Sequence, residues 1–97
     1  AGGYCNQIIC GNANVIGGGL CNTASNYSST ISGGYGNTAS CEGSTIGGGR
    51  CNIASYQCST IGGGAFNTVS GILSTIAGGC YNTASCCFST IASIAYF

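Results

Sequence analysis

Apolar and polar positions along this chain follow a pattern that repeats every fifteen residues. Each repeat holds two short β-prone segments, of the types Asn-Thr-Ala-Ser and Ser-Thr-Ile, and glycine-rich or variable turns separate them. Because the glycines interrupt any helical period, the pattern predicts two short strands per repeat and no helix. The five regular copies are residues 17–31, 32–46, 47–61, 62–76 and 77–91.

A unit of this length has no second layer to bury against, so the copies must stack on one another. We therefore predict an all-β fold, a parallel β-solenoid or flattened β-roll with two short strands per 15-residue coil. In this interpretation residues 1–97 form a single solenoid domain. Residues 2–16 are a degenerate coil that fits with one extra residue between its strands, and residues 92–97 begin a partial coil.

Strand alternation assigns the two faces of each predicted strand. The isoleucine that ends each repeat is its invariant large apolar residue, so we expect it to point inward. The invariant asparagine also points inward, and stacked asparagines can hydrogen-bond to one another and to turn backbone. The predicted core ladder consists of Ile31, Ile46, Ile61, Ile76, Ile91, Asn22, Asn37, Asn52, Asn67 and Asn82.

Charge is almost absent, since one arginine (Arg50) and one glutamate (Glu42) are the charged side chains of 97 residues. Soluble monomers use charge to resist association, so we expect this surface to be covered by copies of the chain, in a trimer or an end-stacked filament. The composition argues against nucleic-acid binding and membrane insertion. No histidine or aspartate could activate a serine, so we expect neither catalysis nor a cofactor. Aromatic side chains at turn positions are expected to pack between protomers, namely Tyr27, Tyr35, Tyr56, Phe66 and Tyr81.

The nine cysteines favour an oxidising, extracellular setting, and neither histidine nor a CxxC motif accompanies them to indicate a metal site. With the first copy aligned on its asparagine, Cys5 and Cys21 share a position in neighbouring coils, ~5 Å apart and within disulfide range. Cys41 and Cys58 are a second candidate pair, offset by two positions. A different interpretation is that the cysteines are small turn hydrophobes that stay reduced. Candidates for bonds between chains are Cys51, Cys80, Cys86 and Cys87.

Outward hydroxyls form a predicted grid with spacings of ~7 Å and ~5 Å. This grid resembles the Thr-x-Thr arrays of insect-type ice-binding solenoids, which would make it an ice or ligand face. Hydroxyl ladders also stabilise an uncharged sheet without any further role, and Ile53 interrupts the array. The residues of this candidate face are Thr23, Ser25, Thr38, Ser40, Thr68, Ser70, Thr83 and Ser85.

The stretch NTASCEGSTIGGG, residues 37–49, and its counterparts in the other copies resemble the head repeats of YadA-like trimeric autotransporter adhesins. Related repeats occur in viral and phage fibre proteins. The resemblance extends over nearly the whole chain and implies left-handed parallel β-rolls that associate as trimers. We therefore expect a structural subunit of an extracellular, cell-surface or virion-surface fibre, built from stacked solenoids and crosslinked by disulfides. The alternative is an adhesin head or an ice-binding module that uses the outward hydroxyl rows.

Overall fold

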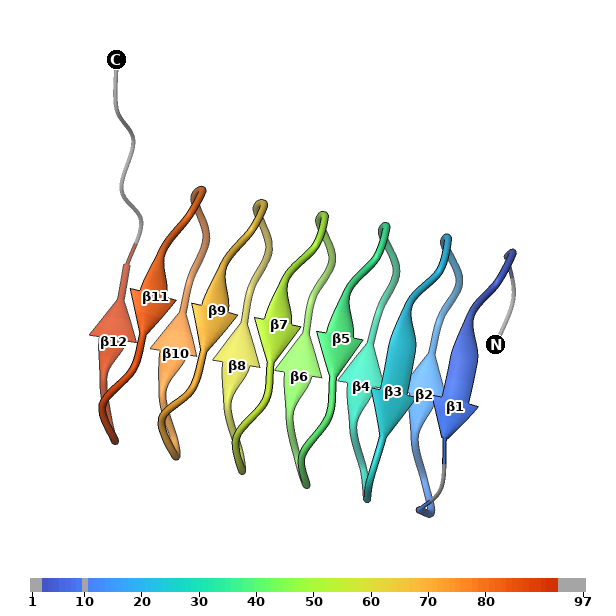
Figure 1. Cartoon of the computed structure of the whole chain (residues 1–97), viewed down its shortest axis with the longest axis horizontal. Coiled ribbons are helices and arrows are strands. Elements are labelled where there is room, and N and C mark those ends of the chain that lie inside the picture. The colour runs from blue at the N-terminus through green and yellow to red at the C-terminus, as the bar shows by residue number, and fades with distance from the viewer. Residues whose placement is uncertain (1–2, 10, 93–97) are drawn as a thin grey trace.

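The computed structural model describes residues 3–9 and 11–92 and consists of short strands joined by turns (Figure 1). It confirms the predicted parallel β-solenoid, with about fifteen residues and two strands in each coil. Within the described residues no helix is long and apolar enough to span a membrane. The strands are β1 (Gln7–Ile9), β2 (Val15–Ile16), β3 (Thr23–Ser25), β4 (Thr30–Ile31), β5 (Thr38–Ala39), β6 (Thr45–Ile46), β7 (Ile53–Ala54), β8 (Thr60–Ile61), β9 (Thr68–Val69), β10 (Thr75–Ile76), β11 (Thr83–Ala84) and β12 (Thr90–Ile91).

Odd-numbered and even-numbered strands form two separate parallel sheets, in the orders β1-β3-β5-β7-β9-β11 and β2-β4-β6-β8-β10-β12. The chain therefore passes from one sheet to the other and back in every coil, which gives the flat stack in Figure 1. The molecule measures 34 × 27 × 12 Å along its principal axes, and the short dimension corresponds to two packed sheets.

Strand register shows how the first coil differs from the others. Gln7 pairs with Thr23, sixteen residues away, whereas Val15 pairs with Thr30, fifteen away. One additional residue therefore lies between the two strands of the first coil. Of the segment 92–97, where a partial coil is expected, residues 93–97 lie outside the described part of the chain.

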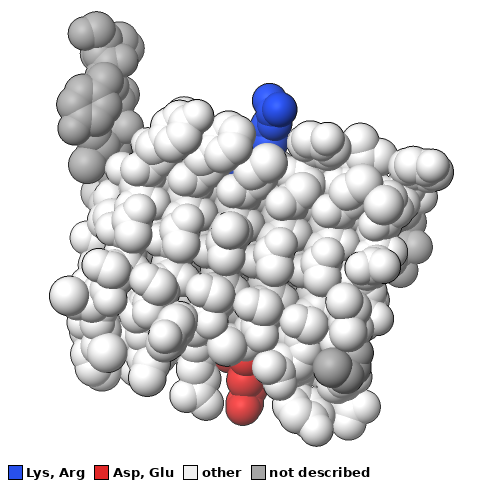
Figure 2. Space-filling view, in the orientation of Figure 1, with Lys and Arg blue, Asp and Glu red and all other residues white. Residues whose placement is uncertain are grey.

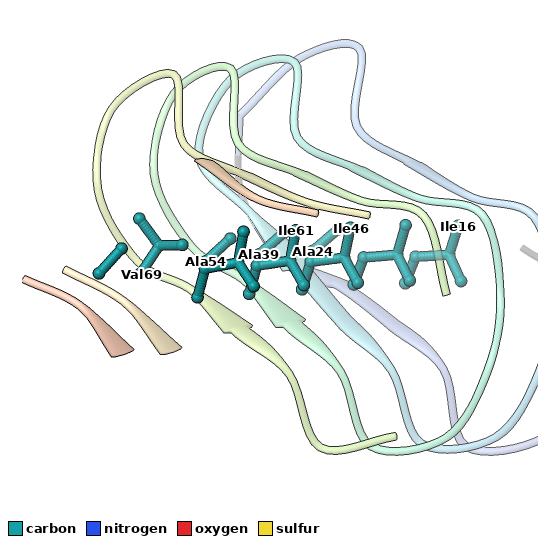
Figure 3. Close-up of a cluster of buried hydrophobic side chains, with 10 residues drawn as sticks. Ile16, Ala24, Ala39, Ile46, Ala54, Ile61 and Val69 are labelled. Carbon is teal, nitrogen blue, oxygen red and sulfur yellow. The ribbon is translucent and has the colours of Figure 1, made fainter. Parts of the chain in front are cut away.

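The core is a narrow column between the two sheets (Figure 3). Each regular coil contributes one isoleucine from the even sheet and one alanine, or Val69, from the odd sheet. These side chains run in a single line, with Ile46 and Ile61 as successive members of one stack. Each coil buries little apolar volume. The columns of buried asparagines and serines described below therefore contribute much of what holds the coils in register.

Non-glycine residues occupy the left-handed backbone region at both turns of the coil. Phe66 and Tyr81 do so in the turn before an odd strand, each with φ of 57°. Leu73 and Phe88 do so in the turn before an even strand, with φ of 57° and 61°. Bulky residues are rarely found in this region, so the stack of neighbouring coils must hold the turns in this conformation.

Candidate functional site

The interior contains an asparagine ladder that links successive coils. The backbone N–H and the Nδ2 of Asn67 both donate to Oδ1 of Asn52, at 3.0 and 3.1 Å. The same Nδ2 also donates to the carbonyls of Gly63 and Gly79, at 3.0 and 2.8 Å. Within the described residues every buried side-chain nitrogen and oxygen has a partner. The polar interior therefore orders the coils.

Invariant serines close the turn between the odd and the even strand of each coil. Ser29 Oγ lies 2.7 Å from the carbonyl oxygen of Ser25 and 2.9 Å from that of Cys41, in the next coil, so its single proton is shared between these two acceptors. Ser74 Oγ likewise donates to the carbonyl of Cys86 at 2.6 Å. These hydroxyls are buried and face backbone carbonyls, so they bind the turns together.

The structure places the residues of the predicted core ladder in two continuous columns. All but two are fully buried, since Ile91 is half-buried and Asn82 is 7% exposed. Fully buried are Ile31, Ile46, Ile61, Ile76, Asn22, Asn37, Asn52 and Asn67.

The predicted hydroxyl face lies on the odd-numbered sheet. Ile53 sits in register between Thr38 and Thr68 and is 40% exposed, so it divides the threonine row into two halves. The threonine row of the even-numbered sheet has no such interruption, and its residues are paired in register from coil to coil. The sequence feature that could have identified this second row is that its threonine is invariant in all five regular copies. That row consists of Thr30, Thr45, Thr60, Thr75 and Thr90.

Of the cysteines, the structure brings Cys5 and Cys21 together. Both are exposed, and both have positive φ in the same turn of neighbouring coils. A hydrogen bond with the Cys5 thiol, followed by partial desolvation and by repulsion from Cys5, raises the pKa of the Cys21 thiol. The geometry of the two turns therefore places the predicted pair side by side in neighbouring coils.

Cys41 and Cys58 occupy different columns. Cys58 lies over Gly43 of the preceding coil. A Cβ added at Gly43 would lie 3.3 Å from the Sγ of Cys58. Cys51 lies over Gly36 in the same way. The backbone of Cys80 pairs with that of Ala65 in an isolated parallel β-bridge. The cysteines of the described chain are all free, and those at exposed positions are Cys5, Cys21, Cys58, Cys80, Cys86 and Cys87.

One edge of the solenoid, formed by the turns that lead into the odd strands, is rich in aromatic rings. The rings of Phe66 and Tyr81 are stacked, with centroids 5.0 Å apart and an interplanar angle of 5°. The Arg50 guanidinium carbon lies 5.6 Å from the ring centroid of Tyr35 and 5.8 Å from that of Phe66. We call this surface the arginine edge, and it is defined by Tyr35, Arg50, Phe66 and Tyr81.

The opposite edge, formed by the turns that lead into the even strands, carries a surface concavity. Tyr56, Ile72 and Leu73 are 46%, 39% and 47% exposed on this edge. We call it the glutamate edge. The concavity is lined by Asn26, Cys41, Glu42, Tyr56, Gln57 and Ile72.

The strand register, the polar columns and the nearly uncharged surface define a β-solenoid repeat protein. Comparison of the chain with protein-family models, with curated proteins and with solved structures finds no match. Within the described residues, no three histidine, cysteine, aspartate or glutamate side chains lie together as metal ligands would. In the part of the chain that the structure describes, the features that could serve a function are the two hydroxyl faces, the two edges and the exposed thiols.

Proposed function

We propose that the protein is a structural subunit that associates with copies of itself into an extracellular or virion-surface fibre. The observation that carries the proposal is the set of large apolar side chains exposed along both edges of a rod with only two charged residues. Exposed apolar patches of this kind mark surfaces that bind other proteins. A surface with so little charge offers little resistance to association.

The role of such a subunit is passive and depends on stiffness. Backbone hydrogen bonds join each coil to the next at the strands and also at the turns, as between Tyr35 N–H and the carbonyl of Gly49 at 2.9 Å. The asparagine and serine columns add side-chain hydrogen bonds to the same junctions. A coil therefore cannot slip relative to its neighbours without losing several bonds together, which suits a rod that transmits load.

Self-association is tested by sedimentation velocity over a range of concentrations, with electron microscopy of the same samples. The variant Phe66→Asn/Leu73→Asn removes an apolar side chain from each edge, and asparagine tolerates the positive φ of both positions. We expect filaments or discrete oligomers for the parent and weaker association for the variant, with unchanged circular dichroism. A matched control, Thr45→Ser on the even-numbered sheet, is expected to assemble like the parent. A parent chain that stays monomeric at all concentrations contradicts the proposal.

Disulfides are a second part of the proposal. The adjacency of Cys5 and Cys21 supports a bond within the chain, and the exposure of Cys80, Cys86 and Cys87 supports bonds between chains. Cys51 is half-buried, which leaves it less accessible for the same role. Purified, air-oxidised protein is expected to form covalent oligomers on a non-reducing gel. Identical monomer bands with and without reductant would exclude bonds between chains.

A second candidate function is binding to an ordered surface such as ice. It is supported by the in-register threonine row of the even-numbered sheet and by the interrupted row of the odd-numbered sheet. Thermal hysteresis of the soluble chain tests this candidate. If the odd face binds ice, Ile53→Thr completes its array and raises the hysteresis, whereas Thr60→Tyr lowers the hysteresis if the even face does. Absence of hysteresis in all three proteins removes the candidate.

A further inference from the structure

The two charged side chains of the chain lie on opposite edges of the solenoid. Figure 2 shows Arg50, in blue, and Glu42, in red, projecting from the two long edges of the flat molecule. Arg50 belongs to the turn before β7, and Glu42 belongs to the turn between β5 and β6. Both are exposed. Since the width of the molecule separates them, they cannot pair within one chain.

The two residues nevertheless lie at nearly the same level along the axis. Eight residues separate them, which is about half of a 15-residue coil. At the ~4.8 Å spacing of neighbouring strands, half a coil corresponds to roughly 2–3 Å of advance. A second copy placed beside the first by sideways translation therefore presents its Glu42 opposite Arg50 at almost the same height.

We infer that the protein associates edge to edge with a second copy, Arg50 of one copy pairing with Glu42 of the next. The inference rests on the proposed function and specifies which surfaces meet. The glutamate edge of one copy then covers the arginine edge of the other. Each such contact buries one apolar edge of each copy. Charge complementarity favours a second copy as the partner, because Arg50 is the one cationic side chain of the sequence and Glu42 is the one anionic side chain.

The surroundings of each group favour a well-ordered pair. The rings of Tyr35 and Phe66 lie close to the Arg50 guanidinium and restrict its motion. A guanidinium beside aromatic rings retains planar N–H donors that can bind a carboxylate at two points. Glu42 lines the concavity with Tyr56 and Ile72. An ion pair formed between these apolar surroundings is less screened than one in open water.

The charges also disfavour two symmetric arrangements of two copies. A two-fold dimer whose axis passes close to Arg50 would place Arg50 against Arg50, and one whose axis passes close to Glu42 would place Glu42 against Glu42. Like charges brought together in this way oppose association. The Arg50–Glu42 contact joins two different edges, so it repeats from copy to copy and closes into a ring or continues as an open array.

Charge exchange tests the inference, with self-association measured by sedimentation at low ionic strength. Arg50→Glu and Glu42→Arg are each expected to weaken self-association on the order of tenfold or more. The double exchange, Arg50→Glu/Glu42→Arg, is expected to restore it to within a few-fold of the parent. An equimolar mixture of the two single variants is expected to form mixed oligomers, since one carries acidic groups on both edges and the other carries basic groups.

A control variant, Thr45→Glu, adds a charge on the even-numbered sheet away from both edges and is expected to associate like the parent. Circular dichroism verifies that each variant remains folded. If the parent associates and both single variants associate equally well, the inference fails and the proposed function stands. If the double exchange fails to recover association, the Arg50–Glu42 pair is also excluded. A monomeric parent overturns both.

Discussion

The side-chain oxygen of Asn22 accepts two hydrogen bonds from Asn37 in the next coil, one from the backbone N–H at 2.9 Å and one from Nδ2 at 3.1 Å. Asn37 also donates to the carbonyls of Gly33 and Gly49, at 3.1 and 3.0 Å. One carboxamide therefore connects its own coil with the coils before and after it. The ladder turns a weak apolar core into a continuous stack.

Asn52→Ala tests the ladder in the middle of the molecule. The substitution removes the acceptor of the buried Asn67 N–H and the donor to the carbonyls of Gly48 and Gly64. Because each unsatisfied buried group costs ~1–3 kcal/mol, we expect a loss of roughly 2–4 kcal/mol in the free energy of unfolding. Gln57→Ala removes an exposed carboxamide of the same coil and is expected to cost less than about 0.5 kcal/mol. Urea unfolding of dilute protein measures both, and equal effects would contradict the role of the ladder.

Gly64→Ala and Gly63→Ala distinguish two glycines that the repeat conserves equally. Gly64 has a φ of +90°, and a Cβ there would collide with the carbonyl oxygen of Gly79 in the next coil. We expect its substitution to abolish folding or to lower the thermal midpoint severely. A Cβ at Gly63 meets nothing within 4 Å, so Gly63→Ala is expected to change stability by at most about 1 kcal/mol. Thermal unfolding followed by circular dichroism measures both, and comparable losses would refute this assignment.

Ile61→Ala tests the apolar column. Ile61 is fully buried and lies in register between Ile46 and Ile76, so truncation leaves a cavity that both neighbours line. Such substitutions cost ~2–5 kcal/mol, and Ile61→Val is expected to cost only ~0.5–1.5 kcal/mol. The neighbouring Thr60→Ala acts on the outer side of the same strand, where we expect a smaller effect than that of Ile61→Ala. A larger loss for Thr60→Ala in chemical denaturation would show that the core lies elsewhere.

Cys21 is expected to react slowly with iodoacetamide at mildly alkaline pH. Its hydrogen bond with Cys5 raises its pKa, so less of the nucleophilic thiolate is present at a given pH than for an ordinary exposed thiol. Cys5→Ala is expected to lower the pKa of Cys21 and to move the rise of its alkylation rate to lower pH. Mass spectrometry of alkylated peptides over a pH series measures this shift. Cys58→Ala, in a distant coil, serves as control, and an identical shift there would contradict a local cause.

Strand direction, coil length and the inward side of the strands could be predicted because they follow from periodicity. An isoleucine recurring every fifteen residues can form a column only if each repeat advances the chain by one coil, as the pairing of Ile31 with Ile46 shows. The adjacency of Cys5 and Cys21 follows from the same register. The positive φ of Phe66 could not be predicted, because its local preference disfavours that conformation and the neighbouring coils impose it.

By itself the sequence determined the stacking of the coils, the isoleucine and asparagine columns and the scarcity of charge, since these depend on which residues recur and at what interval. Only the tertiary structure decided that Gly64 tolerates a side chain less well than Gly63. A Cβ added at Gly64 would collide with the carbonyl oxygen of Gly79, and this contact arises between coils. The tertiary structure also decided that Arg50 and Glu42 project from opposite edges of the solenoid. That relationship depends on where each turn of a flattened coil reverses the chain, and no local preference encodes it.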